Sequence, residues 1–161
     1  MVQSTSLCAL FCGTAAGTKS AERGAYYAGP GNRFRDVLHN VQLTSHKLTP
    51  DEFSTLPPFG LGLTDVAKGA SGPDAKIERP EYDAHTFKTK IRHLRPGFVA
   101  FNGKNAACAF YCLPTAQLEY GRGTPVPDFP QVFILPSTSG AARRYWNEEW
   151  WQEFARLLGP K

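Results

Sequence analysis

The sequence predicts an α/β fold: a three-layer α/β/α sandwich with a central, mostly parallel sheet, formed by a single domain over residues 1–161. Short apolar runs alternate along the chain with segments of helical periodicity, which is the pattern of parallel strands covered by helices on both faces. Three of the apolar runs lead into glycine- or serine-rich turns, as expected where parallel strands end at one edge of a sheet. The length suits one domain with a substantial core.

The first half of the chain supplies two strands and the first helix. Residues 7–12 form an apolar run that predicts a buried strand. A helix is expected over 32–41, because its apolar residues recur at helical spacing: Phe34, Val37, Leu38 and Val41. The sequence TPDE predicts a helix start, with Thr49 as N-cap and Glu52 three residues later. A strand or extended segment over 60–67 follows.

The second half continues the alternation of helices and strands. In order, we expect a charged amphipathic helix over 80–94, a strand over 98–101, a helix from about Lys104, a loop over 114–130, a buried strand over 132–135 and a helix over 146–158. The loop is expected because several glycines and prolines interrupt that stretch.

Composition limits the class of protein. Hydrophobic residues make up 42% of the chain and charged residues 20%, as in globular proteins, and the net charge of +4 mildly favours an anionic partner. No apolar run reaches the ~18 residues that a membrane span needs. The N-terminus lacks the basic and apolar regions of a secretory signal, so we expect a cytoplasmic protein whose four cysteines are free thiols.

Polar turns follow three of the predicted strands: CGTAAG (12–17), FNGK (101–104) and LPSTSGAAR (135–143). Each one alone reads as an ordinary strand-to-helix turn. Together, and with the paired Tyr26 and Tyr27 after the first, they predict a ligand-binding cleft at the carboxyl edge of the sheet. The first turn lacks the GxGxxG pattern of a dinucleotide site and the GK[ST] of a P-loop.

The segment CGTAAG, followed by GAYYAGPGNRF (24–34), resembles the first motif of the uracil-DNA glycosylase superfamily, and is most similar to the mismatch-specific uracil and thymine branch. STSGAAR (137–143) resembles the second motif, while GLGLTDV (60–66) and FNGKNA (101–106) resemble segments between them. The resemblance implies a monofunctional DNA glycosylase of base excision repair. Such an enzyme flips uracil out of DNA, excises it without a cofactor and leaves an abasic site. It also implies a monomer that binds uracil-containing, double-stranded DNA.

The resemblance assigns the recognition of the flipped base to Gly13, Thr14, Tyr27 and Asn32. Tyr27 takes the place of the aromatic ring on which the base stacks, although core packing is the alternative for this residue. Glycines in the loop let backbone N–H groups approach the base and stabilise the departing anion. Asn32 and Arg33 are expected to brace the loop or contact phosphate.

Three positions depart from the family pattern. Ala15 stands where the family has the asparagine that holds the attacking water, and Ser137 replaces an asparagine or histidine. Ala141 stands where a larger apolar side chain fills the space left by the flipped base. We take Asp65, near the end of the second strand, as the candidate for orienting water. Its alternatives are helix capping or a surface ion pair.

The resemblance implies DNA contacts from the last turn and from nearby cations: Gly140, Ala141, Arg143, Lys19 and Arg33. The alternative is that Arg143 and Arg144 are solvated residues that begin the last helix.

No metal is expected, although another branch of the superfamily carries an iron–sulfur cluster. Cys8 and Cys12 would lie roughly 13 Å apart on an extended strand, and the chain has no CxxC. We expect all four cysteines, which include Cys108 and Cys112, to be small buried hydrophobic residues. The four histidines show no ligand spacing.

Two other functions stay open on the sequence. Because Ala15 cannot hold water, the chain could be a glycosylase-like module that binds damaged or abasic DNA with little turnover. A glycosylase for another deaminated base, such as hypoxanthine, is a weaker possibility. Asp65 favours the enzyme.

Overall fold

The structure is a computed structural model that describes residues 7–13, 31–49, 52, 55–66 and 84–159. Within these ranges the strands are β1 (Ala9–Gly13), β2 (Leu61–Asp65), β3 (Phe98–Asn102), β4 (Gly121–Arg122) and β5 (Gln131–Leu135). The α-helices are α2 (Phe34–Asn40), α3 (Ala84–Leu94), α4 (Lys104–Tyr111) and α5 (Glu148–Leu158). Short 3₁₀ segments are η2 (Pro57–Phe59), η5 (Thr115–Gln117) and η6 (Gly140–Tyr145).

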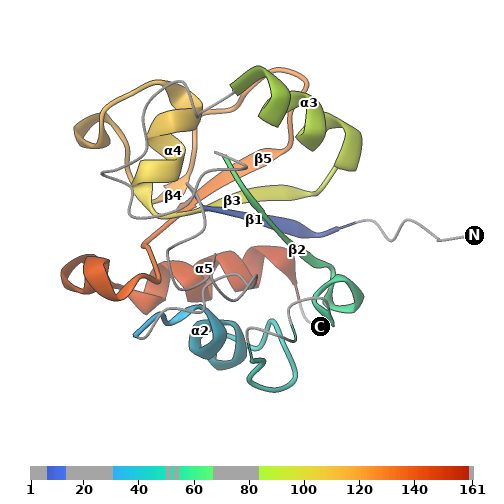
Figure 1. The fold of residues 1–161 in the computed structure, drawn as a ribbon, viewed down its shortest axis with the longest axis vertical. Helices are drawn as coiled ribbons and strands as arrows, with labels where there is room; N and C mark the ends of the chain where they lie inside the picture. The colour runs from blue at the N-terminus through green and yellow to red at the C-terminus, as the bar shows by residue number, and fades with distance from the viewer. Residues whose placement is uncertain (1–6, 14–30, 50–51, 53–54, 67–83, 160–161) are drawn as a thin grey trace, which may run out of the picture.

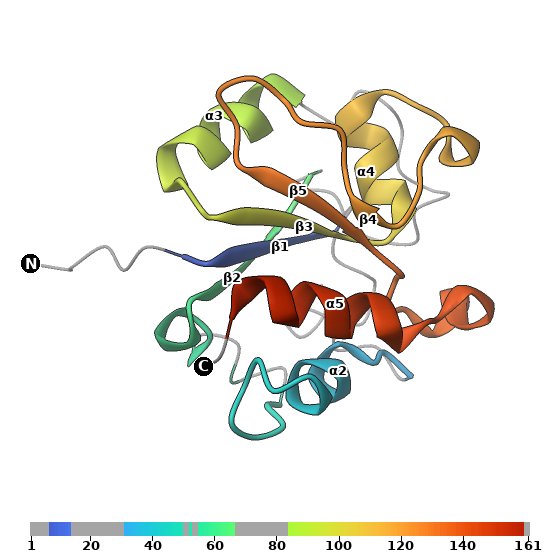
Figure 2. The same cartoon turned by 180° about the vertical axis from the view of Figure 1, so that it is seen from behind.

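The strands form one five-stranded sheet in the order β2-β1-β3-β5-β4. The first four of these pair in parallel, and β4 joins the edge antiparallel to β5. The sheet lies between two helical layers, with α2 and α5 on one face and α3 and α4 on the other (Figures 1 and 2). The predicted α/β fold with a mostly parallel central sheet is therefore confirmed.

Both faces of the sheet are buried, and successive residues of β1 supply both cores. Phe11 lies in the core beneath α2 and α5, where its ring stacks on Trp151 at 5.6 Å between centroids and meets Phe34 edge-on at 5.4 Å. Leu10 and Cys12 lie in the opposite core, with α3 and α4. A strand buried on both faces needs apolar residues at every position, so the pattern in 7–12 is continuous rather than alternating.

Most predicted elements are confirmed, with shifted ends. The helix expected over 32–41 is the shorter α2, and the part of the 80–94 prediction that the structure describes is α3. The prediction of a loop over 114–130 was incomplete, because this stretch contains the two-residue strand β4. A strand of two residues is too short to show the hydrophobic pattern by which strands are predicted. The last helix begins at Glu148 rather than 146, where the Asn147 side chain accepts a bond from the Glu149 N–H at 3.0 Å.

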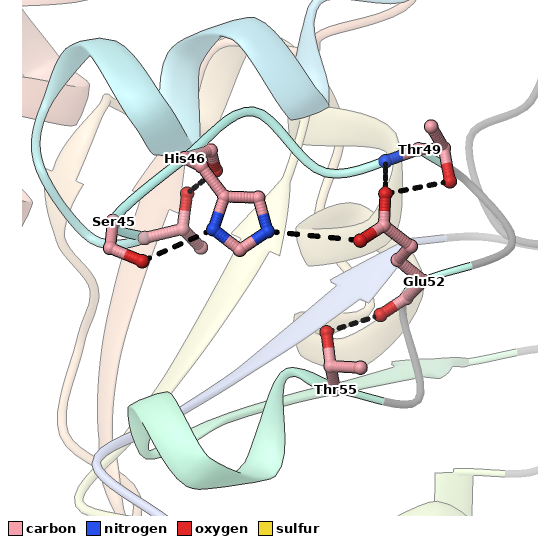
Figure 3. Close-up of polar contacts among 6 residues, drawn as sticks. Ser45, His46, Thr49, Glu52 and Thr55 are labelled. Atoms are coloured by element: carbon pink, nitrogen blue, oxygen red, sulfur yellow. Dashed lines mark hydrogen bonds and ion pairs between the residues drawn. The ribbon is translucent and has the colours of Figure 1, made fainter.

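Thr49 and Glu52, the two residues of the predicted cap, are bonded to one another (Figure 3), while residues 50–51 and 53–54 of the helix expected there lie outside the described residues. The Thr49 backbone N–H and its hydroxyl both donate to Glu52 Oε1 at 3.0 Å. These bonds, the backbone one foremost, hold the pKa of the Glu52 carboxyl below its usual value, and the nearby His46 adds to the effect. His46 Nε2 lies 3.7 Å from Glu52 Oε2. This cluster ties down the surface segment between α2 and η2.

None of the four cysteines, all of which the structure describes, forms a disulfide, but the expectation that all are buried was wrong for three of them. Cys12 is buried in the sheet, whereas Cys108 is half-buried and Cys8 and Cys112 are exposed. Cys8 precedes the strand, and Cys112 follows the last turn of α4, so neither is covered by a second layer. Among the described residues, no three side chains of His, Cys, Asp or Glu are grouped so as to hold a metal ion. None of the helices in these ranges is long and apolar enough to cross a membrane.

Candidate nucleic-acid site

The carboxyl ends of the parallel strands bring the predicted turns to one edge of the sheet. Gly13, the last residue of β1, pairs with Asp65, the last residue of β2, and the carbonyl of Gly13 accepts the Val66 N–H at 2.8 Å. On the other side of β1, Asn102 pairs with Leu135, and the Gly103 N–H donates to the Leu135 carbonyl at 2.8 Å. The ends of four strands are thus held in register.

Asn102 fastens the last turn to the third strand. Its Nδ2 donates to Thr138 Oγ1 at 3.0 Å, and its Oδ1 accepts the Thr138 backbone N–H at 3.0 Å. Thr138 is almost fully buried, at 1% exposed. The indole N–H of Trp151 donates to the Pro136 carbonyl at 3.0 Å and anchors the same turn from α5. The turn is therefore held from both β3 and α5, as positioning of a ligand would require.

Ser137 lies half-buried on this turn, close to the backbone of Gly103. Its Oγ accepts the Ser139 N–H at 3.1 Å, so the hydroxyl hydrogen can still donate to a ligand. Gly103 has φ +105°, and a Cβ there would lie 3.0 Å from the Ser137 Cβ. Any larger residue at 103 would push against Ser137, which explains the glycine in the FNGK turn.

The described end of the first motif contacts the second motif directly. The Arg33 N–H donates to the Thr138 carbonyl at 2.8 Å. Gly31 has φ +77°, and a Cβ at this position would lie 3.8 Å from the Gly140 Cα and 4.0 Å from Arg143 Nη2. The described end of the first motif and the second motif, far apart in the sequence, are therefore neighbours in the structure.

Asn32 and Arg33 brace this junction. Asn32 Oδ1 accepts the Phe34 N–H at 2.9 Å and so satisfies a backbone donor at the start of α2. The Arg33 guanidinium lies over the Trp146 ring, 5.4 Å from its centroid. Its Nη1 atom is buried and has no hydrogen-bond partner among the residues that the structure describes.

Asp65 is buried, with 6% of its surface exposed. Leu61 and Leu63 of the same strand face the core beneath α2 and α5, so the alternation of the strand places Asp65 on that face. Thr64 faces the opposite layer, where Lys90 of α3 donates to its hydroxyl. Asp65 therefore lies at the sheet edge, next to Gly13, on the side of the sheet that carries α2.

The cations of the last turn belong to η6, not to the last helix. Ser139 Oγ accepts the Ala141 N–H at 3.2 Å and caps η6, which carries Arg143 and Arg144 on its exposed surface. The alternative that these arginines begin the last helix was therefore wrong. Ala141 is also exposed. Four predicted site residues lie outside the described part of the chain: Thr14, Ala15, Lys19 and Tyr27.

Sequence reasoning missed the residues that hold the site together. The pair Asn102 and Thr138 and the ring of Trp146 had no predicted role. Asn102 itself was a usable signal in the sequence. It is a polar residue at the end of the apolar run of β3, and its position is paired with Leu135, the end of β5.

One family model matches residues 4–158 of the chain, and its description is uracil DNA glycosylase superfamily. The match spans both motif segments and every strand of the sheet. Membership supports DNA as the substrate and hydrolysis of an N-glycosidic bond as the general reaction. The chain belongs to the uracil DNA glycosylase superfamily.

Proposed function

We propose that this protein is a monofunctional glycosylase that flips uracil out of double-stranded DNA and hydrolyses its N-glycosidic bond. The observation that carries the proposal is the bond from the Arg33 N–H to the Thr138 carbonyl. It joins the two segments that resemble the motifs for base recognition and DNA contact. We further propose that the enzyme is a cytoplasmic monomer of one domain that needs no metal, and that it belongs to the mismatch-specific branch.

In the proposed reaction, Tyr27 stacks on the flipped base, and Gly13 and Thr14 let backbone N–H groups reach its edge. The bond from C1′ of the sugar to N1 of uracil breaks, and its electron pair stays on the base. N–H donors and the Ser137 hydroxyl stabilise the resulting anion. Water adds to C1′ of the cation-like sugar, and its proton passes to Asp65 or to solvent. The departing base takes up a proton, and an abasic site remains.

Asp65 is suited to this role by position and burial. It ends β2 beside Gly13, the residue that begins the proposed base pocket. A carboxylate at 6% exposure is shielded from bulk solvent, which strengthens its interaction with a developing positive charge on the sugar. This carboxylate compensates for Ala15, whose methyl group cannot hold water.

DNA contacts are proposed for the exposed face of the last turn. Gly140 lies beside Gly31, and Arg143 points toward that junction. Arg33 and Lys19 extend the positive surface. The side chain of Ala141 is too small to fill the gap that the flipped base leaves in the duplex.

The test uses a duplex with one uracil, incubated with excess protein and then cleaved with alkali at abasic sites. We expect cleavage that persists in EDTA. Duplexes with thymine mispairs or hypoxanthine, and single-stranded uracil DNA, define the substrate range. If hypoxanthine alone is excised, the base assignment is wrong while the glycosylase reaction stands. If no base is excised from any substrate, the enzyme proposal fails.

The second candidate, a module that binds damaged DNA without turnover, is favoured by Ala15. It predicts tight binding to an abasic duplex and no excision. Ala15→Asn then separates the two functions. An amide at this position could hold water, so an inactive binding module should gain measurable excision, while an active enzyme should keep or modestly raise its rate.

A further inference from the structure

Aromatic and basic side chains gather beside the candidate site, at the ends of β3 and β5. We call this set the aromatic–basic surface, which consists of Lys104, Tyr120, Arg144, Tyr145 and Trp150. Its members come from the start of α4, the approach to β4, the end of η6 and the first turns of α5. These elements lie at the same end of the sheet as the carboxyl edge (Figures 1 and 2). The proposed reaction uses none of these residues.

Tyr145 is the most prominent member. Its side chain is 63% exposed, more than any other large hydrophobic residue in the described part of the chain. The Arg144 guanidinium lies 5.7 Å from the centroid of its ring. An exposed aromatic ring next to a cation offers a flat apolar face together with a phosphate contact.

Tyr120 provides a second ring close by. Lys104 Nζ lies 4.6 Å from its centroid, and the Trp150 ring lies 6.2 Å away, tilted by 44°. Burial, and then the Coulombic effect of Tyr145, raise the pKa of Tyr120. A Cβ on Gly121 would lie 3.2 Å from Trp150, so the glycine lets the indole pack closely against β4.

The surface is continuous with the candidate site through the backbone. Lys104 follows Gly103, which lies next to Ser137. The segment η6 begins just after the Thr138 turn and ends at Tyr145. A DNA strand that places a base near Ser137 would therefore continue past Lys104 and Arg144. Two exposed carboxylates, Glu119 and Glu149, lie on the same elements, so stacking rather than net charge must supply much of the affinity.

We propose that the aromatic–basic surface docks an unpaired stretch of DNA, with one nucleobase stacked on Tyr145 and phosphates at Arg144 and Lys104. This inference rests on the proposed function only in taking DNA as the ligand. Two observations favour nucleic acid over a protein partner. Each of the two tyrosine rings has a cation next to it, and the surface borders the candidate site of a chain that belongs to a DNA glycosylase superfamily. Stacking is tolerant of sequence, so this contact carries no base preference.

The experiment measures binding of a fluorescent, undamaged single-stranded oligonucleotide by anisotropy over a range of salt concentrations. Tyr145→Ala should weaken binding about tenfold or more, whereas Tyr145→Phe, which keeps the ring, should bind like the wild type. Arg144→Ala and Lys104→Ala should each lower the log–log salt slope by about 0.7. Leu94→Ala, an exposed residue at the end of α3, is the matched control and should change nothing.

Equal binding by Tyr145→Ala and the wild type would overturn the proposal, as would a Tyr145→Phe variant as weak as Tyr145→Ala. If Tyr145→Ala leaves DNA binding unchanged but alters the sedimentation of the protein, the surface is a protein contact, and the proposal is also overturned. The oligonucleotide contains no uracil, so this outcome is independent of excision. If the wild type excises uracil but Tyr145→Ala binds single-stranded DNA as tightly as the wild type, only this inference is refuted. Protein that binds through Tyr145 but excises nothing refutes the proposed function alone.

Discussion

The backbone N–H of Arg33 and the carbonyl of Thr138 form a hydrogen bond of 2.8 Å that joins the entry to α2 with the turn after β5. Backbone groups in such a contact have no side chain to mark them in the sequence. The bond brings Gly31 against Gly140 and places Arg33 over Trp146. The described end of the first motif is therefore tied to the second motif, and a change that loosens the Thr138 turn should also disturb that end.

Asn102→Ala tests this coupling. The variant loses both side-chain bonds to Thr138 and leaves two polar groups of a largely buried residue unpaired. The free energy of unfolding should fall by about 1–3 kcal/mol, measured by urea denaturation. Asn40→Ala is the matched control, since it removes one exposed bond to Glu148 and should cost much less. If both variants are equally stable, Asn102 does not hold the turn.

Asp65→Ala tests the proposed water-orienting carboxylate. Single-turnover excision of uracil should fall ~100-fold or more, the effect typical of a positioned base. Asp36→Ala is the control, because that carboxylate pairs with Lys47 on the surface and should leave excision unchanged. Circular dichroism should show that the Asp65 variant is folded. A folded variant with a nearly wild-type rate would remove Asp65 from the mechanism.

Tyr27→Ala tests base stacking by the residue that the family resemblance assigns to it. Loss of the ring should cost ~1–3 kcal/mol in binding a uracil-containing duplex, whereas Tyr27→Phe should be nearly silent. Binding is measured by anisotropy, with Tyr26→Phe as a neighbouring control. Equal damage from Tyr27→Phe and Tyr27→Ala would show that the hydroxyl, not the face of the ring, carries the function.

Arg143→Ala tests the DNA contact of η6. If the exposed guanidinium binds phosphate, the variant should weaken binding to uracil-containing and undamaged duplex alike. The log–log salt slope should also drop by about 1. A loss confined to duplex, with single-stranded uracil still processed, would indicate that the side chain fills the space left by Ala141. Unchanged binding to both substrates would show that this turn does not touch DNA.

Tyr111→Phe tests a dependence of stability on alkaline pH. Burial raises the pKa of Tyr111 from 10.0 to about 12, and its hydroxyl donates to the Thr124 carbonyl at 2.8 Å. Because the pKa is higher in the folded state, this stabilisation is fully present below pH 10 and is lost as pH rises through about 12.

The stability difference between wild type and Tyr111→Phe should therefore be constant at neutral pH and shrink in that alkaline window. Urea denaturation at several pH values, followed together with tyrosinate absorbance, measures this change. A difference that does not vary with pH would contradict the raised pKa.

The local pattern of the chain was sufficient to predict the sheet and its helices. The continuous apolar runs at 7–12 and 132–135 predicted strands buried on both faces, and β1 and β5 occupy these positions. The short antiparallel strand β4 was missed, because pairing of two residues depends on the neighbouring β5 rather than on their own sequence. Likewise, the 3₁₀ turn η6 between β5 and the last helix was not predicted, because its cap is a local bond from the Ala141 N–H to the Ser139 side chain.

What the sequence determined here is local: the alternation of strands and helices, the glycine and serine turns at strand ends, and the motifs of the superfamily. Tertiary structure decided which of these residues meet. Asn102 is bonded to Thr138, Arg33 lies over Trp146, and Asp65 is buried beside Gly13. Such pairs leave no periodic trace, because each depends on the register of parallel strands joined by long crossovers. Only the folded sheet brings their partners within hydrogen-bond distance.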